Sequence, residues 1–156
     1  MTAETITALL RKRHAGQIFV TELRGGSGSR ESDNSYIDAY ALHPYPSKQN
    51  CRVAYEVKVS RSDFLRDVKQ PHKHRAALVH SNEFYFVAPV GMLAAVEMPL
   101  FAGLLEVKTI EFGTHKGEKY LGHPTLVAPW RDTNPPSWRF VASLCRSVAR
   151  QKAKTP

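Results

Sequence analysis

Cysteine is scarce in this chain, which has only Cys51 and Cys145 among its 156 residues. Two cysteines are too few for a disulfide scaffold, and cytosolic thiols normally stay reduced. Each cysteine lies among apolar residues in a periodic segment, and this pattern predicts buried structural thiols. The class of small disulfide-stapled domains is therefore excluded.

Long apolar runs are also missing, and no stretch approaches the ~20 residues that a membrane helix requires. The segment from Met1 to His14 is amphipathic and lacks the apolar centre and the small-residue cleavage site of a signal peptide. We therefore expect a cytoplasmic protein with no membrane partner. The length suits a single domain over residues 1–156 that buries a real core.

Acidic residues are in the minority, with 14 Asp and Glu against 22 Lys and Arg and a net charge of +8. Such an excess favours polyanionic partners, of which nucleic acid is the commonest. A merely basic, soluble surface accounts for the same charge. The hydrophobic content of 42% excludes a disordered chain.

Hydrophobic periodicity predicts a mixture of helices and strands. Helices are expected at 2–14, 60–70, 71–79 and from 134 onward, and strands at 17–23, 36–42, 52–59, 84–88 and 104–110. Ser60 and Asp63 have the spacing of a capping box. The side chains expected to face inward from the last helix are Trp138, Val141, Leu144, Cys145 and Val148. This order predicts an α/β fold, with a mixed central β-sheet flanked by helices and an antiparallel hairpin of 36–42 with 52–59.

A Glu-x-Lys tripeptide occurs first at Glu56-Val57-Lys58, on a strand whose other face is apolar. Strand alternation points Glu56 and Lys58 together, away from that apolar face. The preceding strand offers Asp38 at a non-apolar position, where pairing could bring it beside Glu56. A basic helix follows at once, so this context favours an active site.

The second tripeptide, Glu106-Val107-Lys108, lacks both the preceding acid and the following helix. No acid lies on a strand before it and no helix follows it. We interpret Glu106 and Lys108 as ordinary solvent-facing strand residues.

Paired carboxylates have a definite chemical use. Two carboxylates a few ångströms apart repel each other, and a shared divalent cation relieves that repulsion. Mg²⁺ prefers oxygen ligands, polarises a phosphoryl oxygen and lowers the pKa of a bound water. A lysine on the same strand face can orient that water and stabilise charge on a phosphate. A strand-face salt bridge between exposed acids and Lys58 accounts for the same spacing.

Asp38 followed by Glu56-Val57-Lys58, in a helix–strand–strand–strand–helix context, resembles the PD-(D/E)XK nuclease superfamily. More narrowly, three motifs resemble bacterial MmcB-like proteins associated with DNA repair. They are Tyr36-Ile37-Asp38-Ala39-Tyr40, Glu56-Val57-Lys58-Val59-Ser60-Arg61-Ser62-Asp63-Phe64 and Phe84-Tyr85-Phe86-Val87-Ala88-Pro89. The similarity covers residues 17 to 109 and implies a restriction-endonuclease-like core.

The resemblance also implies a chemistry. It implies hydrolysis of DNA phosphodiester bonds in repair or processing, with Mg²⁺ or Mn²⁺ as cofactor. The metal ligands carry over to Asp38, Glu56 and the carbonyl of Val57, and the catalytic lysine to Lys58. The signature proline before the aspartate is Ile37 here, which removes no ligand. Superfamily members often have a further acid on the first helix or strand, where Glu4 and Glu22 are candidates that we leave unassigned.

The basic segment after the active strand contains Arg61, Arg66, Lys69, His72, Lys73, His74 and Arg75. Arg61, Lys69 and Lys73 are predicted to bind the DNA phosphates that flank the cut site. A solvated helix face is the alternative. A zinc site of His72, His74 and His80 lacks any Cys-x-x-Cys or second histidine cluster to support it.

Two rival functions remain open. The first is a catalytically silent DNA-binding protein of the same fold that acts with a repair partner. The second is an RNA-directed enzyme or binder, to which Tyr36, Tyr40 and Tyr55 could contribute a stacking surface. A homodimer is compatible with each function, and nothing in the sequence identifies its interface.

Overall fold

The computed structural model describes residues 1–25, 36–112, 115–120 and 123–153. The described residues form one sheet with the strand order β1-β2-β3-β4-β5-β6. Its strands are β1 (Ile18–Arg24), β2 (Tyr36–Leu42), β3 (Arg52–Val57), β4 (Glu83–Pro89), β5 (Gly103–Phe112) and β6 (His115–Tyr120). Strands β3, β4 and β5 are parallel and the other pairings are antiparallel. The predicted mixed sheet and the β2–β3 hairpin are therefore confirmed.

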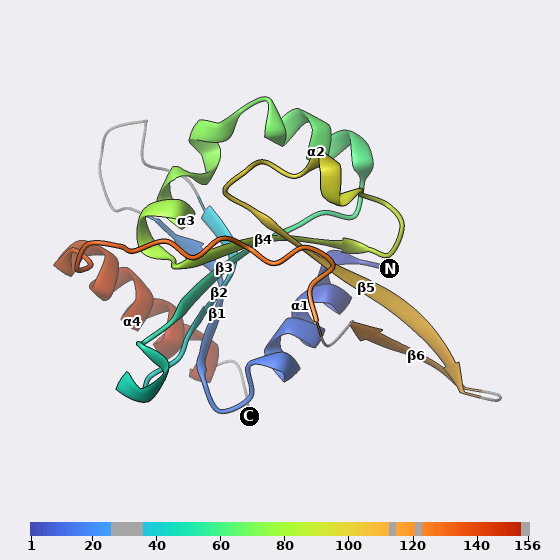
Figure 1. Ribbon diagram of the computed structural model, residues 1–156. Coiled ribbons are helices and arrows are strands. Elements are labelled where there is room, and N and C mark those ends of the chain that lie inside the picture. The colour runs from blue at the N-terminus through green and yellow to red at the C-terminus, as the bar shows by residue number, and fades with distance from the viewer. Residues whose placement is uncertain (26–35, 113–114, 121–122, 154–156) are drawn as a thin grey trace.

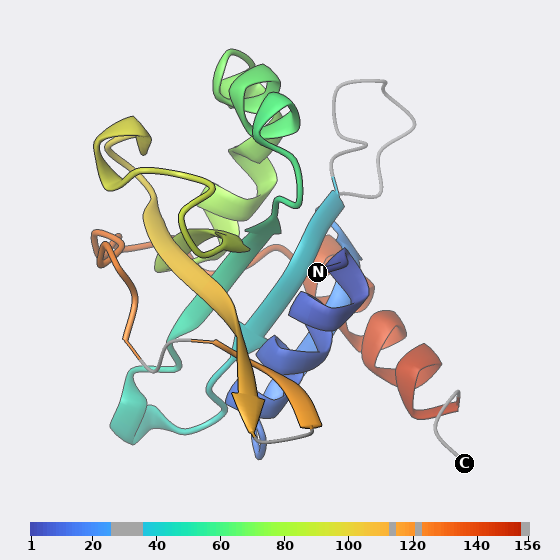
Figure 2. The same ribbon diagram turned by 90° about the vertical axis from the view of Figure 1, so that its right-hand side faces the viewer.

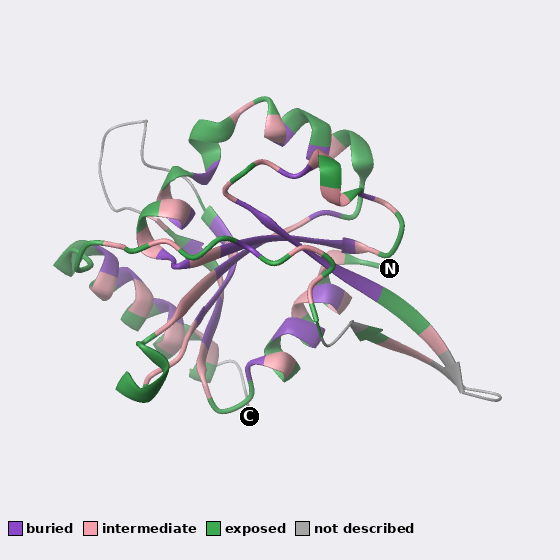
Figure 3. Cartoon of the chain, in the orientation of Figure 1, coloured by how far each residue is buried: buried purple, intermediate pink, exposed green. Residues whose placement is uncertain are grey.

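Helices cover both faces of this sheet (Figures 1 and 2). They are α1 (Ala3–Arg13), α2 (Arg61–Val68), α3 (Arg75–His80) and α4 (Trp138–Ala153), with 3-10 turns at Pro46–Lys48, Pro71–His74 and Ala95–Glu97. Helix α1 packs on one face, and helices α2, α3 and α4 pack on the other. Strand β4 is buried on both faces, as its continuous apolar run predicts (Figure 3).

Helix α1 forms as its sequence predicts. The backbone N–H of Thr5 donates to the Thr2 hydroxyl oxygen at 3.2 Å, so Thr2 is the N-cap. The buried side chains of this helix are the predicted apolar stripe, Ile6, Leu9 and Leu10. Gly16 follows with φ of +82°, a left-handed conformation that suits glycine and leads the chain into β1.

Helix α4 begins four residues later than predicted and buries a different face. Trp138 is 86% exposed and Cys145 is exposed, so both inward assignments are wrong. Ser143 is buried instead, and its hydroxyl donates to the carbonyl of Arg24 at 2.9 Å. Because α4 packs against the outer strand β1, the Ser143 hydroxyl satisfies a backbone carbonyl at the edge of the sheet.

The second Glu-x-Lys tripeptide is only partly exposed. Lys108 is exposed as predicted, but Glu106 is buried, so its solvent-facing assignment is wrong. Its carboxylate accepts bonds from the Gly91 backbone N–H at 2.8 Å and from the Thr125 hydroxyl at 2.7 Å. Glu106 therefore ties two loops to β5.

Strand β6 has no counterpart among the predicted strands, because its sequence HKGEKY shows no apolar alternation. It exists through antiparallel pairing with β5, which outweighs its weak propensity. None of the helices in the described ranges is long and apolar enough to cross a membrane.

Gly103 offers a test of packing at the start of β5. A Cβ at this position would press on the Tyr85 ring and lie 2.6 Å from the Ala128 backbone nitrogen. We expect Gly103→Ala to lower the free energy of unfolding by about 1–3 kcal/mol, measured by urea denaturation. Gly117→Ala on β6 is the control, because among the described residues its Cβ would approach nothing closer than the Ile110 carbonyl at 3.9 Å. Equal unfolding midpoints for the two variants would contradict this packing.

Candidate active site

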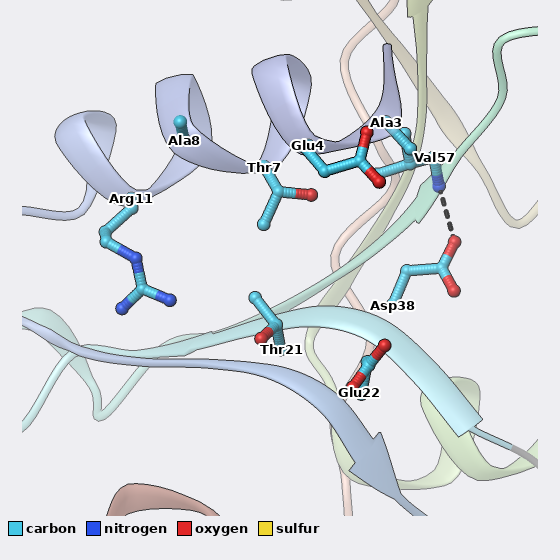
Figure 4. A pocket seen from close by; sticks show the side chains of 9 residues that line it. All are labelled: Ala3, Glu4, Thr7, Ala8, Arg11, Thr21, Glu22, Asp38 and Val57. Atoms are coloured by element: carbon cyan, nitrogen blue, oxygen red, sulfur yellow. Dashed lines mark hydrogen bonds between the residues drawn. The ribbon is translucent and has the colours of Figure 1, made fainter. Parts of the chain in front are cut away.

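Asp38 and Glu56 meet where strands β2 and β3 separate. Continued one step beyond the pair Ala39 and Tyr55, the register places Asp38 opposite Glu56. The Asp38 carboxylate accepts a hydrogen bond from the Val57 backbone N–H at 2.9 Å (Figure 4). This bond takes the place of the next backbone hydrogen bond between β2 and β3, and it holds the carboxylate at the end of β3.

Lys58 follows β3 directly and is 3% exposed. Its backbone N–H donates to the Val87 carbonyl at 2.8 Å, so the chain still follows β4 here. The ammonium donates to Glu56 at 2.8 Å, to Asp63 at 3.0 Å and to Asp67. Glu56 and Lys58 therefore point the same way, as predicted, and they face helix α2.

The predicted capping box of Ser60 and Asp63 is wrong. Ser60 is the N-cap of α2, but its hydroxyl bonds that of Ser62 at 2.7 Å and caps no backbone N–H. Asp63 instead accepts bonds from Lys58 and Arg66. A charge-assisted bond to a buried ammonium is stronger than a bond to an exposed amide, so the ion pair prevails.

The charges of the site are unevenly compensated. Burial raises the pKa of Asp38, and burial together with the charge of Asp38 raises the pKa of Glu56 to about 7. Burial opposes the charged form of Lys58, but its carboxylate partners outweigh burial and raise its pKa. Burial also acts to raise the pKa of Asp67, but bonds from Lys58 and Lys73 lower it to about 2. Asp67 is thus fully paired, whereas Asp38 and Glu56 carry negative charge that the protein only partly balances.

His74 belongs to this region, although its sequence context suggested a DNA-facing segment. It is 3% exposed, and burial lowers its pKa to about 4, so the ring is neutral at pH 7. Its Nδ1 lies 3.9 Å from the Glu56 carboxylate. The rings around it are those of Phe84, Phe86 and Phe101. The buried positions of α2, the turn and α3 are Phe64, Asp67, His74 and Ala77, which are spaced as on one face of a helix. This spacing could have predicted that His74 is buried.

A pocket of about 470 Å³ opens beside Asp38, between α1 and strands β1 to β3 (Figure 4). The carboxylates of Glu4, Glu22 and Asp38 lie toward one end of it, and Arg11 lies toward the other. Glu22 has φ of +51°, a conformation that is uncommon outside glycine. The register of β1 with β2 places Glu22 opposite Asp38, so both candidate further acids share a pocket with Asp38.

Two of the three predicted DNA-binding residues have carboxylate partners within the protein. Arg61 makes a two-bond ion pair with Glu97, and Lys73 bonds Asp67 at 3.0 Å. Lys69 is exposed. Phosphate binding by Arg61 or Lys73 would therefore exchange one carboxylate partner for another anion, and the assignment stays a prediction.

The donor atoms suit a hydrated divalent cation. One oxygen of Asp38 accepts from Val57 and one of Glu56 accepts from Lys58, which leaves each carboxylate another oxygen. Mg²⁺ accepts a site of one or two carboxylates completed by water. Across the described ranges, no three His, Cys, Asp or Glu side chains are close enough to hold an ion together, and His72, His74 and His80 form no such group. Any ion here would depend on two carboxylates, backbone oxygen and water.

Comparisons with known proteins define the fold alone. No family model and no curated protein matches the sequence. Among solved structures, the chain is similar to the SPO1766 protein of unknown function from Silicibacter pomeroyi. The TM-score is 0.60 at 20% identity, over 97% of this chain and 84% of that chain. The likeness shows a shared architecture and carries no activity with it.

Glu56 should make the metal-free protein less stable as the pH rises. Its pKa is about 7 in the folded protein against an ordinary value of 4.5, so its stabilising contribution is complete below pH 4.5 and is lost as the pH passes 7. Glu56→Gln removes this titration. Relative to wild type, the variant should gain up to about 3 kcal/mol between pH 5 and pH 8, measured by urea denaturation in EDTA.

The comparison must be between the two proteins, because His74 has the opposite dependence. Its lowered pKa means that its contribution is lost as the pH falls from 6.5 through 4. Parallel pH profiles for wild type and Glu56→Gln would show that Glu56 does not titrate in this range.

Lys58 should be coupled to Asp67 in stability. Removing one partner of a buried ion pair leaves an uncompensated charge, so Lys58→Ala should cost about 3–5 kcal/mol. The double variant Lys58→Ala/Asp67→Asn should cost at least about 1 kcal/mol less than the sum of the single changes. Lys69→Ala, at an exposed position just after α2, should change stability by less than about 0.5 kcal/mol. Additive costs for the first two changes would disprove the coupling.

Proposed function

We propose that this protein is a metal-dependent nuclease that hydrolyses DNA phosphodiester bonds in DNA repair or processing. The supporting observation is the convergence of Asp38 and Glu56, two half-buried acids with raised pKa values, beside Lys58. If Lys58 formed a purely structural salt bridge, Asp63 and Asp67 would suffice as its partners. The presence of Asp38 and Glu56 beside it would then have no purpose. A divalent cation would relieve the repulsion that remains.

The order of elements supports the assignment to the PD-(D/E)XK superfamily. Helix α1, the antiparallel strands β1 to β3, helix α2 and the parallel strand β4 follow one another as the sequence resemblance implies. We assign the restriction-endonuclease-like core and the MmcB-like relationship on this basis, together with the motifs.

The residues divide the proposed chemistry among them. Asp38, Glu56 and the Val57 carbonyl would hold Mg²⁺ or Mn²⁺, which supplies Lewis acidity toward a phosphoryl oxygen and lowers the pKa of a water. The bond from the Val57 N–H keeps Asp38 in place. Lys58 stays charged and bonds Glu56, and it would stabilise the negative charge that develops on the phosphate. Arg61, Lys69 and Lys73 would bind flanking phosphates.

A catalytically silent DNA-binding protein is the second candidate, and one observation favours it. Lys58 is buried and bonded by Glu56, Asp63 and Asp67, so its ammonium is occupied inside the protein. In this alternative the lysine anchors α2, and cutting would fall to a partner repair protein.

The metal site can be tested by calorimetry. Wild type should bind Mn²⁺ and Mg²⁺, whereas Asp38→Asn and Glu56→Gln should each weaken binding at least about tenfold. Asparagine keeps an oxygen that can accept from Val57, so the fold is preserved. Glu106→Gln, a buried glutamate in the second tripeptide, is the matched control and should bind as wild type does. Equal affinity in all four proteins would remove the site from these residues.

Cleavage separates the two candidate functions. Wild type with Mg²⁺ or Mn²⁺ should cut single-stranded or duplex DNA, and the Asp38 and Glu56 variants should not, while Glu106→Gln should. A wild type that binds metal and DNA but cuts neither would establish the silent alternative.

A further inference from the structure

Strand β1 is an outer strand, with α1 beside it toward one face of the sheet and α4 toward the other (Figures 1 and 2). Three hollows follow it: the pocket at Asp38, a second of about 640 Å³ and a third of about 100 Å³. Arg11 lines the first and second, Thr21 and Glu22 line the first and third, and Gln151 lines the second and third. The hollows therefore adjoin one another along β1, and we name them together the β1 groove.

The β1 groove changes charge along its length. Glu4, Glu22 and Asp38 line the pocket at its acidic end, together with Arg11. The basic end is formed by Arg11 and Lys152 in the second hollow and by Arg150 in the third, which Glu22 also lines. Helix α4 has no acidic residue at all. In the part of the chain that the structure describes, no carboxylate lies within ion-pair distance of the three cations at the basic end.

Three cations of α2 and the turn after it differ in this respect. Arg61, Arg66 and Lys73 each bond a carboxylate of the protein itself. An external polyanion would have to displace those partners, whereas no carboxylate of the described residues forms an ion pair with the cations at the basic end of the β1 groove. Electrostatic complementarity therefore favours the groove as the surface that a nucleic acid meets first.

The dimensions and one side chain restrict the form of that nucleic acid. Hollows of about 470 and 640 Å³ are of the size that encloses small molecules, and a duplex with a major groove about 12 Å wide cannot enter them. The guanidinium of Arg11 lies over the Phe19 ring, 5.1 Å from its centroid. Arginine planes of this kind stack on unpaired bases.

We propose that the β1 groove binds single-stranded DNA, with phosphates at Arg150 and Lys152 and the strand leading past Arg11 to Asp38 and Glu56. This inference rests on the proposed function for its choice of DNA as partner. The acidic end repels phosphate unless a cation is bound there, so the basic end supplies the affinity in the absence of metal.

The test is the salt dependence of binding to a fluorescent oligothymidylate in EDTA, measured by anisotropy. Each phosphate contact contributes about 0.7 to the slope of log affinity against log salt for a single strand. Arg150→Ala/Lys152→Ala should therefore lower the slope by about 1.4 and weaken binding. The matched control, Arg139→Ala/Arg146→Ala, removes two exposed charges from the same helix at positions outside the three hollows and should retain the wild-type slope.

Two further arms complete the test. The charge-conserving variant Arg150→Lys/Lys152→Arg should keep the wild-type slope, which separates lost charge from a lost fold. A duplex of the same length should be affected less than the single strand. Equal losses in the two α4 double variants, equal losses for duplex and single strand, or a wild type that binds no single strand would each overturn the proposal.

These results are independent of cleavage, because no metal is present. If the α4 variants do not change single-strand binding, the metal binding measured by calorimetry at Asp38 and Glu56 is unaffected. A protein that binds no Mg²⁺ but shows the groove effect would lose the nuclease assignment and keep the groove.

Discussion

The buried ammonium of Lys58 is the interaction on which the site depends. It joins the end of β3 to helix α2 through Glu56, Asp63 and Asp67. Because taking these charges out of water is costly, the arrangement persists only where every partner is in place. The position of α2 on the sheet is thus set by charge as well as by the packing of its apolar side chains. Asp38 lies outside this network, because Lys58 bonds Glu56, Asp63 and Asp67 but not Asp38.

Much of this site follows from strand alternation. The bounds of β2 match those predicted, and the hairpin register brings Asp38 opposite Glu56. Alternation also places Glu56 and Lys58 on one side. The sequence could not reveal that Asp67 would complete the network, because a carboxylate on an amphipathic helix is normally assigned to solvent.

The wrong assignments share a physical cause. Glu106 and Ser143 of α4 are polar residues that became buried because backbone groups distant in sequence needed partners. Gly91 lies 15 residues from Glu106, and Arg24 lies 119 residues from Ser143. Periodicity reports which residues avoid water, and it contains no information on which buried backbone groups remain unpaired.

The left-handed backbone at Glu22 affects whether a strand of a second molecule can pair with β1. An outer strand offers a row of unpaired groups on which a strand of another molecule can assemble. Glu22 interrupts the regular spacing of that row, and the side chains of Ser143 and Gln151 reach its carbonyls at Arg24 and Thr21. Strand β1 is therefore a poor template for a second chain, and its edge is protected against sheet extension and aggregation at high concentration.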